Sequence, residues 1–271
     1  MELGATEKDF VISSATVMQI ERFKVLGINI GVLDQERTRE FLFETVREGR
    51  RGYVTITNVY SVSEALRDPE LKRIFNKALL STPDGMPMVW MGRLLGHSTI
   101  RRVYGPDLVL NVCDHGRPFG FSHFFFGGNP GVAEDFAANL QGRFPGLKIA
   151  GTFSPPFRPL NEAERSELQK RVRESQPDFF WIGMSTVKQE CFMAEYMSIL
   201  PEAKVFIGVG AAFDFLTGRV KQAPRWMMGL GLEWLFRLFQ EPCRLWRRYL
   251  IYNPLFVVRA AAQLLGLRRE H

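Results

Sequence analysis

The full sequence has 271 residues, 46% of them hydrophobic and 24% charged, a composition typical of a folded globular protein rather than a disordered chain. Its net charge of +6 is concentrated near the C-terminus. Residues 219–271 hold ten Lys or Arg and three Glu, whereas the preceding 218 residues hold 25 basic and 26 acidic side chains. Three widely separated cysteines, with no CxxC pair, argue against a zinc knuckle and against a disulfide framework.

Residues 1–22 are predicted to be a loose leader. They carry acids and no long apolar run, so we expect no secretory signal. No uncharged apolar run in the chain reaches the roughly 18 residues that a membrane-spanning helix needs, and none is expected.

From residue 23, short apolar runs alternate with amphipathic segments. We predict strands at residues 23–30, 53–57, 121–126, 147–151, 179–182 and 204–209. We predict helices at residues 35–48, 70–80, 131–144, 162–175 and 187–200, with Asp34, Asp68 and Asn161 as caps for three of them. This alternation is typical of an α/β fold, in which a parallel sheet carries helices on both faces.

The pattern changes after Gly218, and from Pro224 onward the sequence is helical, with aromatic side chains followed by arginines. We therefore divide the chain into a leader (1–22), an α/β core (23–218) and a basic, aromatic helical appendage (219–271). Aromatic rings with arginines on short helices suit a membrane interface or a diphosphate. The alternative is a helical hairpin packed on the core with solvated arginines. Nucleic acid is a poorer partner, because the aromatic residues are interspersed with Leu and Met.

Small or polar residues follow several predicted strands, where open α/β sheets bind ligands. Thr57 and Asn58 end the strand at 53–57 and could bind a ligand, or Asn58 could simply cap a helix. Asp84, between Pro83 and Gly85, could act as a general base toward a sugar hydroxyl, or could be part of an ordinary turn.

Three further strand exits offer binding groups. Gly127 and Gly128 precede a predicted helix and could approach a nucleotide diphosphate, although a tight turn would look similar. Gln189 could reach a base or sugar, unless it belongs to a solvated helix start. Asp214 lies in an apolar run and needs a partner, either a ribose or base or a structural arginine.

The sequence lacks the motifs of several common kinds of enzyme. The sequence contains no HExxH, no DxD and no GxSxG, and its four histidines do not form a ligand set. We therefore expect no bound metal and no cofactor. An oxidoreductase would lack the GxGxxG fingerprint.

Taken in order, these segments resemble the WecG/TagA/CpsF family of bacterial glycosyltransferases. The similarity spans roughly residues 53–250 and rests on TNVYSVSEAL, TPDGMPMVW, RVYGPDL, FFGGNPGVAE, FPGLKIAG, GMSTVKQE, GVGAAFDFLTGRVKQAPRWM and GLEWLFRLFQEPCRLWRRYL. The resemblance implies a Rossmann-like glycosyltransferase core with a C-terminal helical appendage.

The resemblance also implies site residues. The family's catalytic base falls on Asp84, its arginine in the R-V-x-G-P-D segment on Arg102, and the glutamine of its K-Q-E segment on Gln189. The appendage arginines of the family correspond to Arg237, Arg244, Arg247 and Arg248. Two positions depart from the family pattern: Ile56 stands where the family often has Thr, with Thr55 or Thr57 as substitutes, and Val187 stands where it has Pro.

The implied reaction is an inverting, metal-independent transfer from a UDP-sugar to a polyprenyl-diphosphate-linked saccharide in cell-surface polysaccharide synthesis. The implied location is cytoplasmic, peripheral on the inner face of the cell membrane, and a homo-oligomer is compatible with the sequence. The alternative function is a non-catalytic peripheral membrane protein that binds nucleotide or lipid.

Overall fold

The computed structural model describes residues 18–267, and the predicted leader lies largely outside this range. Its centre is a six-stranded sheet in which every neighbouring pair is parallel, in the order β4-β3-β8-β7-β5-β6. In chain order the strands are β3 (Gly52–Thr57), β4 (Leu80–Pro83), β5 (Ser122–Gly127), β6 (Lys148–Phe153), β7 (Phe179–Gly183) and β8 (Val205–Gly208). The predicted α/β class is confirmed.

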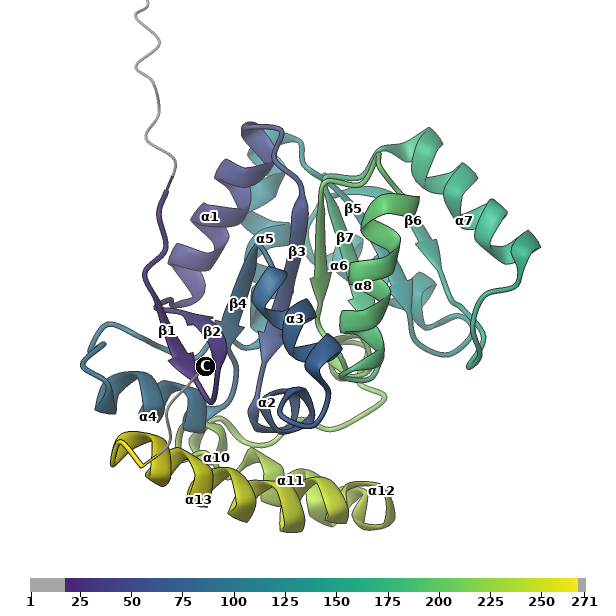
Figure 1. The fold of residues 1–271 in the computed structure, drawn as a ribbon. Helices are drawn as coiled ribbons and strands as arrows, with labels where there is room; N and C mark the ends of the chain where they lie inside the picture. Colours follow the sequence, from purple (N-terminus) through teal and green to yellow (C-terminus); the bar gives the residue numbers. More distant parts are fainter. Residues whose placement is uncertain (1–17, 268–271) are drawn as a thin grey trace, which may run out of the picture.

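Helices cover both faces of this sheet (Figure 1). One face packs against α1 (Gln35–Arg47), α5 (Gly105–Gly116), α6 (Val132–Arg143) and α9 (Ala212–Leu216). The other face packs against α3 (Pro69–Lys77), α7 (Glu162–Ser175) and α8 (Lys188–Ile199). As predicted, Asp34, Asp68 and Asn161 each accept a hydrogen bond from a backbone N–H in the first turn of the helix that follows.

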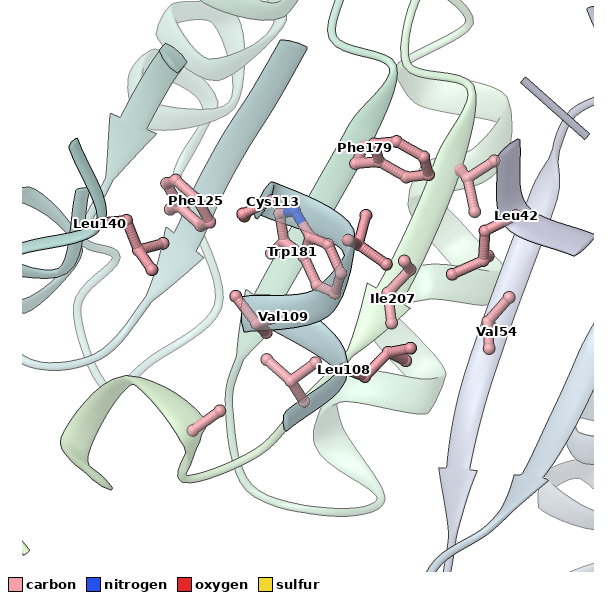
Figure 2. Packing of buried hydrophobic residues seen from close by; sticks show 14 of the residues in the cluster. Leu42, Val54, Leu108, Val109, Cys113, Phe125, Leu140, Phe179, Trp181 and Ile207 are labelled. Atoms are coloured by element: carbon pink, nitrogen blue, oxygen red, sulfur yellow. The ribbon is translucent and has the colours of Figure 1, made fainter. Parts of the chain in front are cut away.

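Successive strand residues point to opposite faces, so the central strands are apolar throughout. In β5, Phe124 and Phe126 join the cluster under α8, whereas Phe125 joins the cluster under α5 and α6. Figure 2 shows the second cluster, in which side chains of the strands meet Leu42 of α1, Val109 of α5 and Leu140 of α6. This packing on both faces makes the sheet a rigid support for its carboxyl edge.

The predicted strand at residues 23–30 is wrong as a member of this sheet. It is a separate antiparallel hairpin of β1 (Arg22–Val25) and β2 (Ile28–Gly31). The chain reverses at Leu26 and Gly27, whose φ angles are 52° and 85°, and two positive φ values form the tight turn that connects a hairpin. The Leu-Gly pair is not a common hairpin signal, which is why the run looks continuous in sequence.

Other elements were not predicted. The helix expected at 70–80 ends at Lys77, and the residues after it form β4, a fully buried edge strand whose Leu-Ser-Thr-Pro sequence shows no strand pattern. Four helices were also missed, namely α2 (Val59–Ala65), α4 (Met86–Leu94) and the already named α5 and α9. In addition, a 3-10 turn spans Arg117–Phe119.

The C-terminal helices lie across the end of the core to which the strands run (Figure 1). They are α10 (Arg225–Gly229), α11 (Glu233–Gln240), α12 (Pro242–Trp246), a π-helical turn (Arg247–Ile251) and α13 (Tyr252–Leu264). Phe256 and Ala260 of α13 are buried in one cluster with the β1–β2 hairpin. In the described range, none of these helices combines the length and apolarity required to cross a membrane.

His123 of β5 is completely buried and accepts a hydrogen bond at Nδ1 from Trp181 Nε1, 3.0 Å away. Indole N–H only donates, so Nδ1 carries no proton and the ring is neutral. Its Nε2 has no hydrogen-bond partner among the described residues. Burial lowers the pKa of His123 to about 3.

This histidine should make the protein sensitive to acid. The unfolded chain binds a proton below about pH 6.5, whereas the folded chain does so only near pH 3, so the free energy of unfolding should fall by about 1.4 kcal/mol per pH unit between them. Urea unfolding at pH 7, 6 and 5 should therefore show that the free energy of unfolding falls less with decreasing pH in His123→Gln than in wild type. The exposed His115→Gln is the control and should follow wild type. Parallel pH curves for wild type and His123→Gln would contradict this prediction.

Candidate active site

Two adjoining cavities lie at the carboxyl edge of the sheet. The smaller cavity, about 110 Å³, is lined by the exits of β3, β4, β7 and β8 and by the C-terminal helices. The larger cavity, about 800 Å³, is lined by the exits of β5, β7 and β8 and by the loop at 155–160. Ligand pockets generally measure about 300–1,000 Å³, so the larger cavity can hold a whole ligand and the smaller one only part of one.

Asp84 lines the smaller cavity and is fixed from two sides. Its backbone N–H donates to Thr57 O at 2.8 Å, which ties the end of β4 to β3. Val103 N–H donates to Pro83 O at 2.8 Å, which brings the Arg102 segment alongside. Arg102 Nε then donates to Asp84 Oδ1 at 2.9 Å. The two residues implied by the family resemblance are thus in direct contact.

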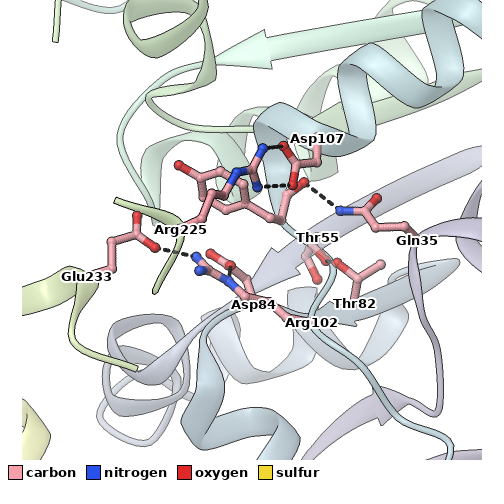
Figure 3. A network of polar contacts seen from close by, with 9 residues as sticks. Gln35, Thr55, Thr82, Asp84, Arg102, Asp107, Arg225 and Glu233 are labelled. Atoms are coloured by element: carbon pink, nitrogen blue, oxygen red, sulfur yellow. Dashed lines mark hydrogen bonds and ion pairs between the residues drawn. The ribbon is translucent and has the colours of Figure 1, made fainter. Parts of the chain in front are cut away.

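Arg102 also contacts the C-terminal helices (Figure 3). Its Nη2 donates to Glu233 Oε2 at 2.6 Å, and its guanidinium lies 4.4 Å from the centre of the Tyr104 ring. Burial alone would lower the pKa of Arg102, but the two carboxylates raise it above its ordinary value, so Arg102 stays charged. Burial raises the pKa of Glu233, against the pull of Arg102.

Sequence reasoning missed Glu233, although a signal was present. It is the single acidic residue in the apolar, aromatic stretch from Trp226 to Phe239. A carboxylate in such a stretch needs a cationic partner if it is buried. Nothing in the sequence identified Arg102 as that partner.

Arginines of the C-terminal helices also line the smaller cavity. Arg237, Arg244 and Arg248 line it, and the first two line the larger cavity as well. The Nε atoms of Arg237 and Arg248 are buried and have no hydrogen-bond partner among residues 18–267. Burial lowers the pKa of Arg248, whose guanidinium lies 4.4 Å above the Tyr60 ring. Glu241 pairs with Arg237 at 3.8 Å and with Arg244 at 2.5 Å, through Nη2 in each case. The two buried Nε donors without an acceptor suit an anionic ligand.

Arg247 is placed differently from the other three arginines. It is exposed, lines neither cavity, and its guanidinium lies 5.2 Å from the Trp246 ring centre.

At the end of β3, one polar side chain lines the smaller cavity. Asn58 lines the smaller cavity and caps α2, where its Oδ1 accepts from the N–H groups of Tyr60 and Ser61. Thr57 is completely buried, with its hydroxyl 3.0 Å from that of Thr55, and neither threonine lines a cavity. Ile56 lines the smaller cavity instead.

Gln189 connects two strand exits. Its Oε1 accepts from Gly210 N–H at 3.0 Å, and its Nε2 donates to Oε1 of the fully buried Glu190 at 3.0 Å. Glu190 Oε2 in turn accepts from Val187 N–H at 2.6 Å. Gln189 lines the smaller cavity, and this chain of contacts fixes the loops after β7 and β8.

The remaining predicted residues surround the larger cavity. Gly128 and Asp214 line it, and Asp214 has no hydrogen bond to its carboxylate from the described part of the chain. Burial raises the pKa of Asp214, against the effect of Arg219 and Arg244. Gly127 lines neither cavity. A Cβ added there would lie 2.5 Å from Gly183 O, so glycine is required for close contact between β5 and β7.

No group of three or more His, Cys, Asp and Glu residues that could hold a metal ion occurs within residues 18–267.

A parallel sheet with helices on both faces and a large cavity at its carboxyl edge is the architecture of Rossmann-like proteins that bind a ligand at that edge. A family model described as the glycosyl transferase WecG/TagA/CpsF family matches residues 23–270, and the chain belongs to that family. The protein is therefore a glycosyltransferase, and the non-catalytic alternative is wrong.

The curated proteins similar to this chain include one from Bacillus spizizenii and one from Bacillus subtilis. Each is named N-acetylglucosaminyldiphosphoundecaprenol N-acetyl-beta-D-mannosaminyltransferase. The first is 29% identical over 75% of this chain and 76% of its own length. The second is 30% identical over 69% of this chain and 70% of its own length.

Val187 has a backbone that proline cannot adopt. Its φ is 80°, a strained value for a β-branched residue, and its N–H is bound by the buried Glu190. Proline fixes φ near −65° and has no N–H. The loop after β7 therefore differs in this chain from one that carries proline at the same position.

Introducing the family residue should accordingly harm this protein. Val187→Pro should lower the free energy of unfolding by about 2–3 kcal/mol, because it displaces φ and removes the N–H that donates to Oε2 of the buried Glu190. Val187→Gly keeps the N–H and accepts a positive φ, so it should remain within about 1 kcal/mol of wild type. Denaturant unfolding measures both variants. Wild-type stability in Val187→Pro would mean that the loop readily takes another conformation.

Proposed function

We propose that this protein transfers a sugar from a UDP-sugar to a polyprenyl-diphosphate-linked saccharide, with inversion and without a metal ion. One observation carries the proposal: Asp84, held by Arg102, lines the same cavity as Arg237, Arg244 and Arg248. A base that faces a cluster of cations is what a reaction with an anionic leaving group requires.

In the proposed reaction Asp84 accepts the proton of the acceptor hydroxyl. The hydroxyl oxygen attacks the anomeric carbon, and the bond from that carbon to the UDP β-phosphate oxygen breaks with its electron pair staying on UDP. Attack opposite the leaving group inverts the anomeric centre. The guanidinium groups of Arg237 and Arg244, at the border of the two cavities, stabilise the charge on the diphosphate.

The nucleoside of the donor belongs in the larger cavity under this proposal. Its volume of about 800 Å³ suits a nucleotide, Gly128 contributes backbone to its lining, and the Asp214 carboxylate is free to accept hydrogen bonds from ribose or base. The arginines can supply the charge stabilisation that a metal ion gives in other transferases, and this supports transfer without a metal ion.

The relatives supply the acceptor class. Both are named for N-acetylglucosaminyldiphosphoundecaprenol as acceptor and for N-acetylmannosaminyl transfer. We take a polyprenyl-diphosphate-linked saccharide as the acceptor here, and we leave the donor sugar to the assay described below. The product would be a cell-envelope polysaccharide such as teichoic acid or exopolysaccharide.

We further propose that the appendage, residues 219–271, binds the inner face of the cell membrane. The outward face of α13 is almost entirely apolar, with Val257 and Val258 64% and 67% exposed, and Phe239 of α11 is 78% exposed. Such an uncovered apolar face marks an interaction surface. The exposed Arg244 and Arg247 suit anionic headgroups beside it.

Asp84→Asn should reduce turnover by about 100-fold or more, because the amide cannot take the proton. The assay measures UDP release with a polyprenyl-diphosphate-GlcNAc acceptor across UDP-GlcNAc, UDP-ManNAc, UDP-Glc and uronic-acid donors, with and without EDTA. We expect acceptor-dependent release from one donor, unaffected by EDTA, with an inverted anomer by NMR. Normal turnover in Asp84→Asn would refute the base, and release abolished by EDTA would refute metal independence.

The membrane proposal has its own test. Val257→Asp with Val258→Asp should weaken co-sedimentation with vesicles containing phosphatidylglycerol by at least about tenfold, since two valines lose their burial in lipid. Ala163→Asp with Ser166→Asp adds the same charge to exposed positions of α7 and should bind as wild type. Equal binding by both pairs would show that α13 does not enter the membrane interface.

A further inference from the structure

Glu233 is the first residue of α11, and it reaches from the C-terminal helices to the arginine that holds the candidate base (Figure 3). We infer that Glu233 is a positioning residue that limits Arg102 to a single hydrogen bond with Asp84 and so leaves the second Asp84 oxygen free for the acceptor's proton. This inference rests on the proposed function of Asp84 as a base.

The inference begins with the way in which Arg102 distributes its donors. Nε donates to Asp84 Oδ1 at 2.9 Å, and Nη2 donates to Glu233 Oε2 at 2.6 Å. The three side chains are only 15–18% exposed, so water competes little for these bonds. The Tyr104 ring, 4.4 Å from the guanidinium carbon, supports one face of the group.

The geometry of arginine gives Glu233 its importance. A guanidinium beside a lone carboxylate tends to pair with it through two parallel N–H···O bonds. In this site Nη2 is engaged by Glu233, and Asp84 Oδ2 accepts no hydrogen bond from residues 18–267. A base whose two oxygens both accepted from one cation would offer a hydroxyl proton only lone pairs on oxygens that are already hydrogen-bonded, and it would be a weaker base.

Because Glu233 belongs to the C-terminal helices, this arrangement exists only while those helices rest on the sheet edge. A second ion pair also joins them to the core. Arg225 of α10 makes two hydrogen bonds to Asp107 of α5, at 2.6 and 2.9 Å. Neither Arg225 nor Asp107 lines a cavity, so this pair offers a matched control for attachment of the helices alone.

The test compares Glu233→Gln, Glu233→Asp and Asp107→Asn in the UDP-release assay. Glu233→Gln should lower kcat by about 10- to 100-fold, the range expected for a displaced catalytic group, with KM values within about threefold of wild type. Glu233→Asp keeps the charge and should recover part of the lost kcat. Asp107→Asn should stay within about threefold of wild type. Vesicle binding should be as in wild type for both Glu233→Gln and Asp107→Asn, because each variant removes only one of the contacts that hold the helices on the core.

Three kinetic results would overturn the inference. The first is a wild-type kcat in Glu233→Gln. The second is an equal loss of kcat in Asp107→Asn, which would indicate that the helices are loosened. The third is the same kcat in Glu233→Gln and Glu233→Asp. A crystal structure of Glu233→Gln tests the same point without turnover. Arg102 should then donate to both Asp84 oxygens, and a single bond, as in wild type, would refute the inference even if no donor supported UDP release. Failure of the proposed function is recognised separately, by the absence of release in wild type.

Discussion

The positive charge of Arg102 lies between two carboxylates that come from opposite parts of the molecule, and the site depends on that contact. A guanidinium taken out of water is strongly unfavourable unless it is paired, and the same holds for each carboxylate. Asp84 belongs to the sheet and Glu233 to the C-terminal helices, so neither part satisfies the arginine alone. Attachment of these helices and completion of the site are therefore one structural event. The more exposed Arg225–Asp107 pair adds much less to it.

The sheet and the C-terminal helices differ in how firmly they are packed. Aromatic side chains fill both faces of the sheet, and the glycines at its carboxyl edge bring β5, β7 and their loops close together. Asp84, Gln189 and Gly210 are fixed there by hydrogen bonds to neighbouring strands and loops. By contrast, α11 contains no fully buried residue, and most of the surface of α13 is uncovered. The rigid part thus holds the base, and the loosely packed part supplies arginines and Glu233.

The sequence was sufficient for the class of fold, because this depends on local patterns, and it made Asp84 a candidate base without predicting the strand β4 that precedes it. Apolar runs followed by small or polar residues indicate parallel strands and their exits, and helix caps such as Asn161 are readable directly. It was not sufficient for the hairpin at Leu26-Gly27 or for β4, whose buried polar residues are stabilised by tertiary contacts such as that between Thr55 and Ser81. Thr57 shows a related limit. Its position at the end of a strand suggested ligand binding, but its hydroxyl contacts that of Thr55 instead. Pairing across long separations, as between Arg102 and Glu233, leaves no local pattern.

Helix α13 packs one face on the β1–β2 hairpin and leaves the opposite face apolar and open, while the arginines of the preceding segment line the smaller cavity. Under the proposed function, the surface that enters the membrane and the groups that bind a lipid-linked diphosphate therefore belong to one continuous segment. The lipid-linked acceptor of the proposed reaction would need to leave the bilayer only far enough to reach those arginines. Because the smaller cavity of about 110 Å³ holds only part of a ligand, only the end of the acceptor that carries the reacting hydroxyl would enter it while the segment rests on the sheet edge. The contact between Arg102 and Glu233 is then kept during the reaction, and it joins the segment that faces the membrane to the residue that holds Asp84.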